Sequence, residues 1–157
     1  QDFRCLKLMP SMMVVAIEKG FSISMAYIVT VHQAKDIPKI GLLGYPDACF
    51  KIKLAGQTKQ TTVKYNCAAA EWNEILKFEV PSEVETPMDT FDEFEIRGLD
   101  QDQIGPDQMF GKAKFQLDSF ENTAFDGWVN LKSSDGSGSG GAVRLSIDYI
   151  AEKLPAF

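Results

Sequence analysis

The amino-acid sequence predicts an all-β fold, namely an antiparallel β-sandwich of eight short strands. Segments that alternate apolar and polar residues recur at fairly regular spacing. Turn-forming residues separate these segments, and almost no part of the chain has helical periodicity. At 157 residues the chain is long enough for one domain with a sizeable core. The spacing of the strands by itself also permits an up-and-down barrel.

Each predicted strand has its own pattern of side chains. In the first, Tyr27, Val29 and Val31 share one face. The last is expected to turn Val143, Leu145, Ile147 and Tyr149 inward. The predicted strands are, in chain order, residues 24–33, 48–54, 58–65, 72–80, 91–97, 110–117, 126–131 and 142–150.

Several further residues are assigned by the same patterns. Cys49 is expected to be a buried thiol, because it lies in an apolar strand. The predicted core also includes Trp72, Ile75, Phe78 and Trp128.

Three connections have distinctive compositions. Residues 36–46 contain prolines and glycines and are predicted to form a loop, but the residues between them are unusually apolar. Residues 118–123 are predicted to form one helical turn with Asp118 as its N-cap. Residues 132–141 are rich in Ser and Gly and are predicted to form a flexible loop.

Charge and cysteine content narrow the function. The net charge of −6 disfavours nucleic-acid binding, which needs Lys and Arg to neutralise phosphates. Residues 51–70 hold four lysines and no acids, whereas residues 79–107 hold ten acids and one arginine. The three cysteines lack metal-type spacing and indicate a reducing, intracellular setting. His32 is the only histidine, and without an activated nucleophile beside it we expect no enzyme.

The stretch from residue 99 to residue 111 gathers three carboxylates, Asp100, Asp102 and Asp107, between two predicted strands. The stretch itself contains no Lys or Arg. Carboxylates gathered in one loop must be fully solvated or bind a cation. This loop is therefore the first candidate for a metal site.

Four motifs, in order, resemble those of the C2 domain, the calcium- and phospholipid-binding β-sandwich of protein kinase C and synaptotagmin. The motifs are Val-His-Gln-Ala-Lys-Asp-Ile-Pro at 31–38, Gly-Tyr-Pro-Asp-Ala-Cys-Phe-Lys-Ile at 44–52, Trp-Asn-Glu at 72–74, and Asp-Gln-Asp at 100–102 with Gly111 closing the loop. The resemblance implies an eight-stranded Greek-key sandwich with phospholipase-type (type II) strand topology. It spans residues 27–151, which leaves residues 1–26 as an N-terminal extension with one candidate extra strand, and residues 152–157 as a tail.

The resemblance also implies a calcium site, which is damaged here. The ligands that match the family pattern are Asp47, Asp100 and Asp102, while Asp107 is a substitute from a neighbouring position. The other two ligand positions are occupied by Gly41 and Gln108. Calcium takes six to eight oxygen ligands, so the lost carboxylates are expected to weaken the site to a Kd of about 10⁻⁴–10⁻³ M, or to abolish it. A solvated relict loop is the competing interpretation.

Two groups of residues are implied to contact lipid. The apolar loop tips are Leu42, Leu43 and Ile104. The basic residues are Lys51, Lys53, Lys59 and Lys64, of which the first two share a face.

The function expected from these features is a non-enzymatic, membrane-docking module of a larger intracellular protein. It would be cytoplasmic and peripherally associated with anionic phospholipid membranes, and its calcium dependence would be weak or absent. The alternative is a structural or protein-interaction domain that has lost calcium and lipid binding, with residues 1–26 binding a partner or a second copy. A third hypothesis, a calcium-switched sensor, requires Asp107 to replace a missing ligand.

Overall fold

The computed structural model describes residues 22–40, 44–80, 91–101, 105–118 and 123–154. Within these ranges the chain forms eight antiparallel strands and no helix, which confirms the predicted all-β class. The described residues accordingly include no helix capable of crossing a bilayer. The strands are β1 (Ser22–Lys35), β2 (Ala48–Leu54), β3 (Gln57–Gln60), β4 (Ala70–Val80), β5 (Phe91–Asp100), β6 (Gln108–Asp118), β7 (Thr123–Lys132) and β8 (Ser139–Leu154).

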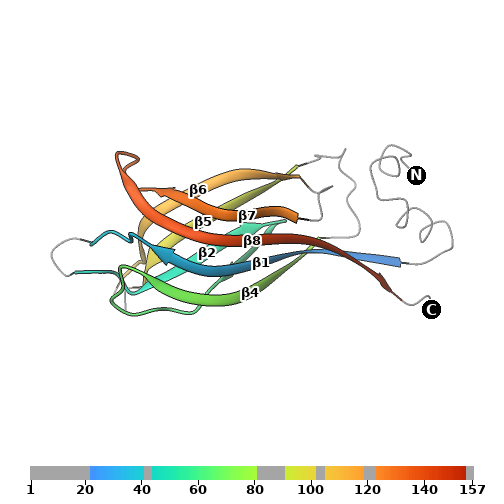
Figure 1. Cartoon of the computed structure of the whole chain (residues 1–157), viewed down its shortest axis with the longest axis horizontal. Helices are drawn as coiled ribbons and strands as arrows, with labels where there is room; N and C mark the ends of the chain where they lie inside the picture. Colours follow the sequence, from blue (N-terminus) through green and yellow to red (C-terminus); the bar gives the residue numbers. More distant parts are fainter. Residues whose placement is uncertain (1–21, 41–43, 81–90, 102–104, 119–122, 155–157) are drawn as a thin grey trace.

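The strands form two layers of four. The hydrogen-bonded order is β3-β2-β5-β6-β7-β8-β1-β4, but β6 and β7 pair only at Lys112 and Lys132, where one layer passes into the other. Figure 1 shows β7, β8, β1 and β4 side by side, with β5 and β2 behind them. The last strand, β8, lies between β7 and β1, an order compatible with the predicted phospholipase-type topology.

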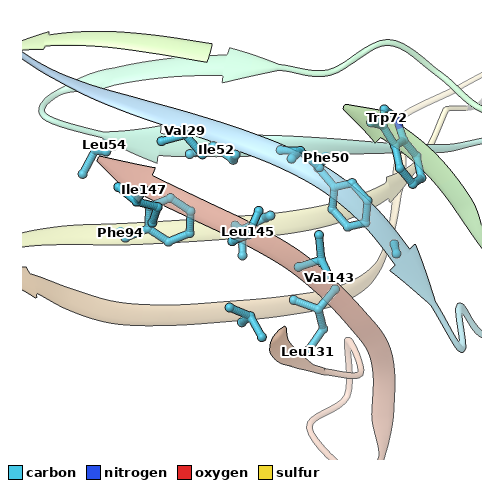
Figure 2. Packing of buried hydrophobic residues seen from close by; sticks show 14 of the residues in the cluster. Val29, Phe50, Ile52, Leu54, Trp72, Phe94, Leu131, Val143, Leu145 and Ile147 are labelled. Atoms are coloured by element: carbon cyan, nitrogen blue, oxygen red, sulfur yellow. The ribbon is translucent and has the colours of Figure 1, made fainter. Parts of the chain in front are cut away.

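The core lies between these layers (Figure 2). Phe50, Ile52 and Leu54 point inward from β2, and Val143, Leu145 and Ile147 point inward from β8, as period-two alternation requires. The face of β1 that was predicted from alternation, Tyr27, Val29 and Val31, is also buried. Cys49 is buried as predicted, although it alternates with Phe50 along β2.

Two residues predicted to lie in the core are on the surface. Ile75 is 67% exposed and Trp128 is 39% exposed. In β4 Trp72 and Phe78 face the core, whereas the side chain of Ile75 lies on the opposite, exposed face of the strand. In β7 Val129 takes the inward position, and Trp128 instead packs under Lys35, whose Nζ lies 4.3 Å from the ring centroid.

The connections also differ from the sequence-based expectations. The strand predicted at 58–65 is only β3, Gln57–Gln60, followed by a single bridge between Ala48 and Lys64. Asp118 is the last residue of β6, and residues 119–122, where the helical turn was predicted, lie outside the described ranges. The loop predicted to be flexible contains a compact turn, because Asp135 Oδ1 accepts hydrogen bonds from Ser137 N and from the hydroxyls of Ser133 and Ser137. These bonds favour the charged form and lower the pKa of Asp135 to about 2.

The open side of the sandwich lies between the edge strands β3 and β4. Side chains bridge it: Gln57 Nε2 donates to the carbonyl of Glu79, and Lys59 Nζ donates to the carbonyl of Lys77. These bonds satisfy carbonyls on the free edge of β4, which would otherwise be available to another strand.

Candidate functional site

The loop end of the sandwich is where the loops predicted to bind calcium meet. Figure 1 shows the β1–β2 and β7–β8 connections at this end, opposite the paired ends of β1 and β8. Backbone hydrogen bonds tie the loops together: Ile37 N donates to Ala68 O at 2.9 Å, Cys67 N to Pro46 O at 3.2 Å, and Gln101 N to Asp47 O at 2.9 Å.

Two of the three described carboxylates of the predicted metal site, Asp47 and Asp100, take part in these ties. Asp100 Oδ1 accepts a hydrogen bond from Asp47 N at 2.8 Å, and Asp47 Oδ1 accepts one from Asn66 N at 2.8 Å. Each carboxylate therefore satisfies a backbone donor on a neighbouring loop, which is a structural role that needs no metal.

The described residues do not by themselves make a calcium centre. Among them, no group of three or more Asp, Glu, His or Cys side chains is placed to hold a metal ion. Asp107 is exposed, and Asp102 lies outside the described residues. Two partly engaged carboxylates fall well short of the six to eight oxygens that calcium takes.

Cys49 lies close to the acidic loop but is not a reactive nucleophile. Burial, helped by the negative charges of Asp107 and Asp100 and opposed by Lys51, raises the pKa of its thiol to about 11. The thiolate, which is the reactive form, is therefore scarce at neutral pH.

The carboxylate of Asp100 is expected to matter as a hydrogen-bond acceptor, not as a charge. Asp100→Ala should lower the free energy of unfolding by about 1–2 kcal/mol, because it leaves the amide of Asp47 without its partner. Asp100→Asn keeps an Oδ1 acceptor and should cost clearly less. Urea unfolding of both variants measures this difference. Equal losses would contradict the structural role, and a loss seen only when calcium is present would indicate a metal ligand.

The apolar loop tips named from the sequence, Leu42, Leu43 and Ile104, lie outside the described residues. The residues described beside them add two aromatic side chains. Tyr45 is 39% exposed, and Tyr65 is 73% exposed in the loop that donates to Asp47. Tyr65 was not among the predicted site residues. Its position between two polar residues, Lys64 and Asn66, was the feature of the sequence that could have indicated an exposed aromatic side chain.

The structure separates the four lysines predicted to bind lipid. Lys51 and Lys53 lie on the outer face of β2, opposite to its buried residues. Lys59 pairs with Ile52 and shares its inner face, so its Nζ lies 5.6 Å from the centre of the Phe78 ring. Lys64 is partly buried beside Ala48. Of these four lysines, only Lys51 and Lys53 lie on the same outer face of one strand.

The family model for the C2 domain matches residues 26–131, which is more than half of the chain. The chain belongs to the C2 domain family. The family match runs from the fifth residue of β1 to the last residue but one of β7. Among curated protein sequences, none matches this chain.

Solved C2 domains share the fold. Domain A of the C2 domains of plant extended synaptotagmin 1 aligns with a TM-score of 0.63 at 22% identity, over 83% of this chain and 95% of that domain. Extended-synaptotagmin 2, solved with its C2 domains A and B, aligns with a TM-score of 0.63 at 23% identity, over 79% of this chain. Human GIVD cytosolic phospholipase A2 aligns with a TM-score of 0.59 at 16% identity, over 82% of this chain.

The matches cover very different shares of these proteins. This chain spans 40% of the two-domain extended-synaptotagmin 2 structure and 17% of the phospholipase. The extended-synaptotagmin 2 pair has also been solved with calcium bound. At these identities the likeness shows the fold, and the residues of this chain must carry any argument about binding.

Proposed function

We propose that this C2 domain is a non-enzymatic module that docks on anionic phospholipid membranes, with weak or absent dependence on calcium. The observation that carries the proposal is the construction of the loop end. Its carboxylates, Asp47 and Asp100, are used as acceptors for backbone amides, while Tyr45 and Tyr65 are exposed beside them. Tyrosine has an apolar ring and a polar tip, which suits the interface between lipid and water.

The available side chains are sufficient for weak docking. Fully burying one large apolar side chain contributes about 1.5–3 kcal/mol. Leu42, Leu43 and Ile104 are the residues proposed to enter the bilayer. A lysine near an anionic surface contributes about 1 kcal/mol, and Lys51 and Lys53 have the outward position for this role. Such a module fits a cytoplasmic, peripherally bound protein in which other domains add to the affinity.

Co-sedimentation with vesicles tests the proposal. The domain is expected to bind vesicles that contain phosphatidylserine, to bind phosphatidylcholine vesicles much less, and to behave almost identically in calcium and in chelator. Leu42→Asp combined with Ile104→Asp should abolish binding, because a charge at each tip opposes burial.

Ile75→Asp is the matched control, since Ile75 is an exposed apolar residue on the outer face of β4, away from the loop end. Equal losses in the control and in the tip variant would show that binding is not made by the loop tips. Absence of binding to either vesicle would remove the proposal. Binding only in calcium would favour the calcium-switched sensor, with Asp107 as the substitute ligand.

The second candidate function is a structural or protein-interaction domain. The contacts of Lys59 favour it, because the ammonium of this lysine bonds to the carbonyl of Lys77 and lies over the Phe78 ring, both on β4. Light scattering of the chain over a range of concentrations, together with the vesicle experiment, separates the two functions. A concentration-dependent dimer without lipid binding supports the second.

A further inference from the structure

Four basic side chains form a row across four paired strands, three in one layer of the sandwich and the fourth where that layer passes into the other. Lys51 of β2 lies opposite Arg97 of β5, Arg97 lies opposite Lys112 of β6, and Lys112 lies opposite Lys132 of β7. Residues directly opposite one another in antiparallel strands project from the same face. We call these four residues the basic row. It brings together cations that are far apart in the sequence, from position 51 to position 132.

Repulsion among the four side chains of the basic row destabilises the isolated domain. Like charges directly opposite one another on neighbouring strands are destabilising, and the row contains three such pairs. Among the described residues, a carboxylate pairs with Arg97 alone, through Glu95. Lys51, Lys112 and Lys132 have no such partner there. A bound anion would relieve this repulsion.

The field of the basic row acts on its neighbour Glu95. Burial raises the pKa of this carboxyl. The hydrogen bond and charge of Arg97, followed by the charges of Lys112 and Lys114, lower it by more, so the pKa is shifted downward overall. Arg97 uses only its Nε in the contact with Glu95. The rest of its guanidinium, with four of its five N–H donors, is available for another acceptor.

The positive charge is uniform only along this one line. The next row of paired residues on the same face is Lys53, Glu95 and Lys114, which alternates in sign. On the other side, Cys49 lies opposite Leu99 and Leu99 opposite Met109, so that row is uncharged. A planar anionic surface laid on this face would also meet Glu95 and Glu93. A linear polyanion that follows the basic row would meet cations throughout.

We infer that the basic row binds an extended acidic peptide segment of a partner protein, which lies across the strands with carboxylates at alternate positions. Strands are spaced about 4.7–4.9 Å apart, so four strands extend over about 14 Å. An extended peptide repeats the same face about every 6.6–6.8 Å, and three alternate acidic residues therefore span about the same length. This contact goes beyond membrane docking: it shares Lys51 with the proposed lipid surface but leaves Lys53 and Tyr45 and Tyr65 of the loop end free.

Fluorescence anisotropy tests the inference with two labelled nonapeptides of identical composition. One carries three glutamates at alternate positions separated by threonines, and the other carries them at consecutive positions. The alternate peptide is expected to bind several-fold more tightly, and added salt should weaken binding because the charges are exposed. Arg97→Gln combined with Lys112→Gln should weaken binding about tenfold.

Lys35→Gln combined with Lys77→Gln is the control, because it removes the same charge from the other layer of the sandwich. Thermal melting confirms that both double variants are folded. The inference is overturned if no peptide binds at millimolar concentration, if the two peptides bind equally, or if the control loses as much affinity as the row variant. It is also overturned if the row variant loses vesicle binding but keeps peptide binding, which would make the row a lipid surface.

Discussion

Replacing Phe50 with alanine is expected to lower the free energy of unfolding by about 3–5 kcal/mol, the range for a buried aromatic residue in a core. Phe50 is completely buried in β2, and its ring meets those of Trp72 at 5.1 Å and Phe110 at 6.0 Å, both edge to face. Figure 2 shows Phe50 and Trp72 close together in the packed interior. The substitution removes both aromatic contacts and leaves a cavity between the two layers.

Urea unfolding followed by tryptophan fluorescence measures this loss. The backbone amide of Phe50 keeps its bond to Thr61 Oγ1 in the variant, so the effect reports on packing alone. Ile75→Ala provides the control and should change stability by less than about 0.5 kcal/mol, since its side chain is exposed. Similar losses in the two variants would mean that Phe50 does not lie at the centre of the core.

Gly140→Val is expected to be destabilising by about 1–3 kcal/mol or more, through overpacking. Gly140 lies where the layers cross, and a Cβ atom on it would come within 2.6 Å of Gly111 Cα and 2.8 Å of Phe110 O. These are backbone atoms, which cannot rotate away as a side chain can. The strand β6 must therefore move away from β8, close to the point where β6 pairs with β7.

Gly138→Val is the matched control for the crossing. It lies two residues before Gly140, directly before β8, and a Cβ atom there would meet only Ser133 Oγ, at 4.0 Å. Thermal unfolding of both variants gives the comparison, and the Gly140 variant should have the clearly lower Tm. A control that melts as early as the Gly140 variant would mean that any bulky residue in this connection is harmful, whatever its distance from Gly111.

Much of the fold could be predicted from the residues because strand alternation is a local property. The bounds predicted for the strand at 48–54 are those of β2. Alternation also predicted the buried faces of β1 and β8. The motifs that resemble a C2 domain, taken in order, indicated the family that the family model shows. Ile75 was a misassignment that parity could have prevented, since it lies three residues from Phe78 and an odd separation puts two strand residues on opposite faces.

The candidate site was less predictable, because its properties depend on contacts between distant segments. The sequence named Asp47 and Asp100 as candidate metal ligands, but only the folded loops show that both accept backbone hydrogen bonds. It grouped Lys59 with Lys51 and Lys53, whereas the pairing of β3 with β2 places Lys59 on the inner face.

The sequence by itself determined the all-β class, most of the strands and the family, because these depend on period-two patterns and on short motifs in a fixed order. The tertiary structure alone decided which charges become neighbours. Arg97 lies in the most acidic part of the chain, yet strand register places it between Lys51 and Lys112. Register depends on the packing of both faces of a sheet and on the geometry of distant turns, which no local pattern encodes.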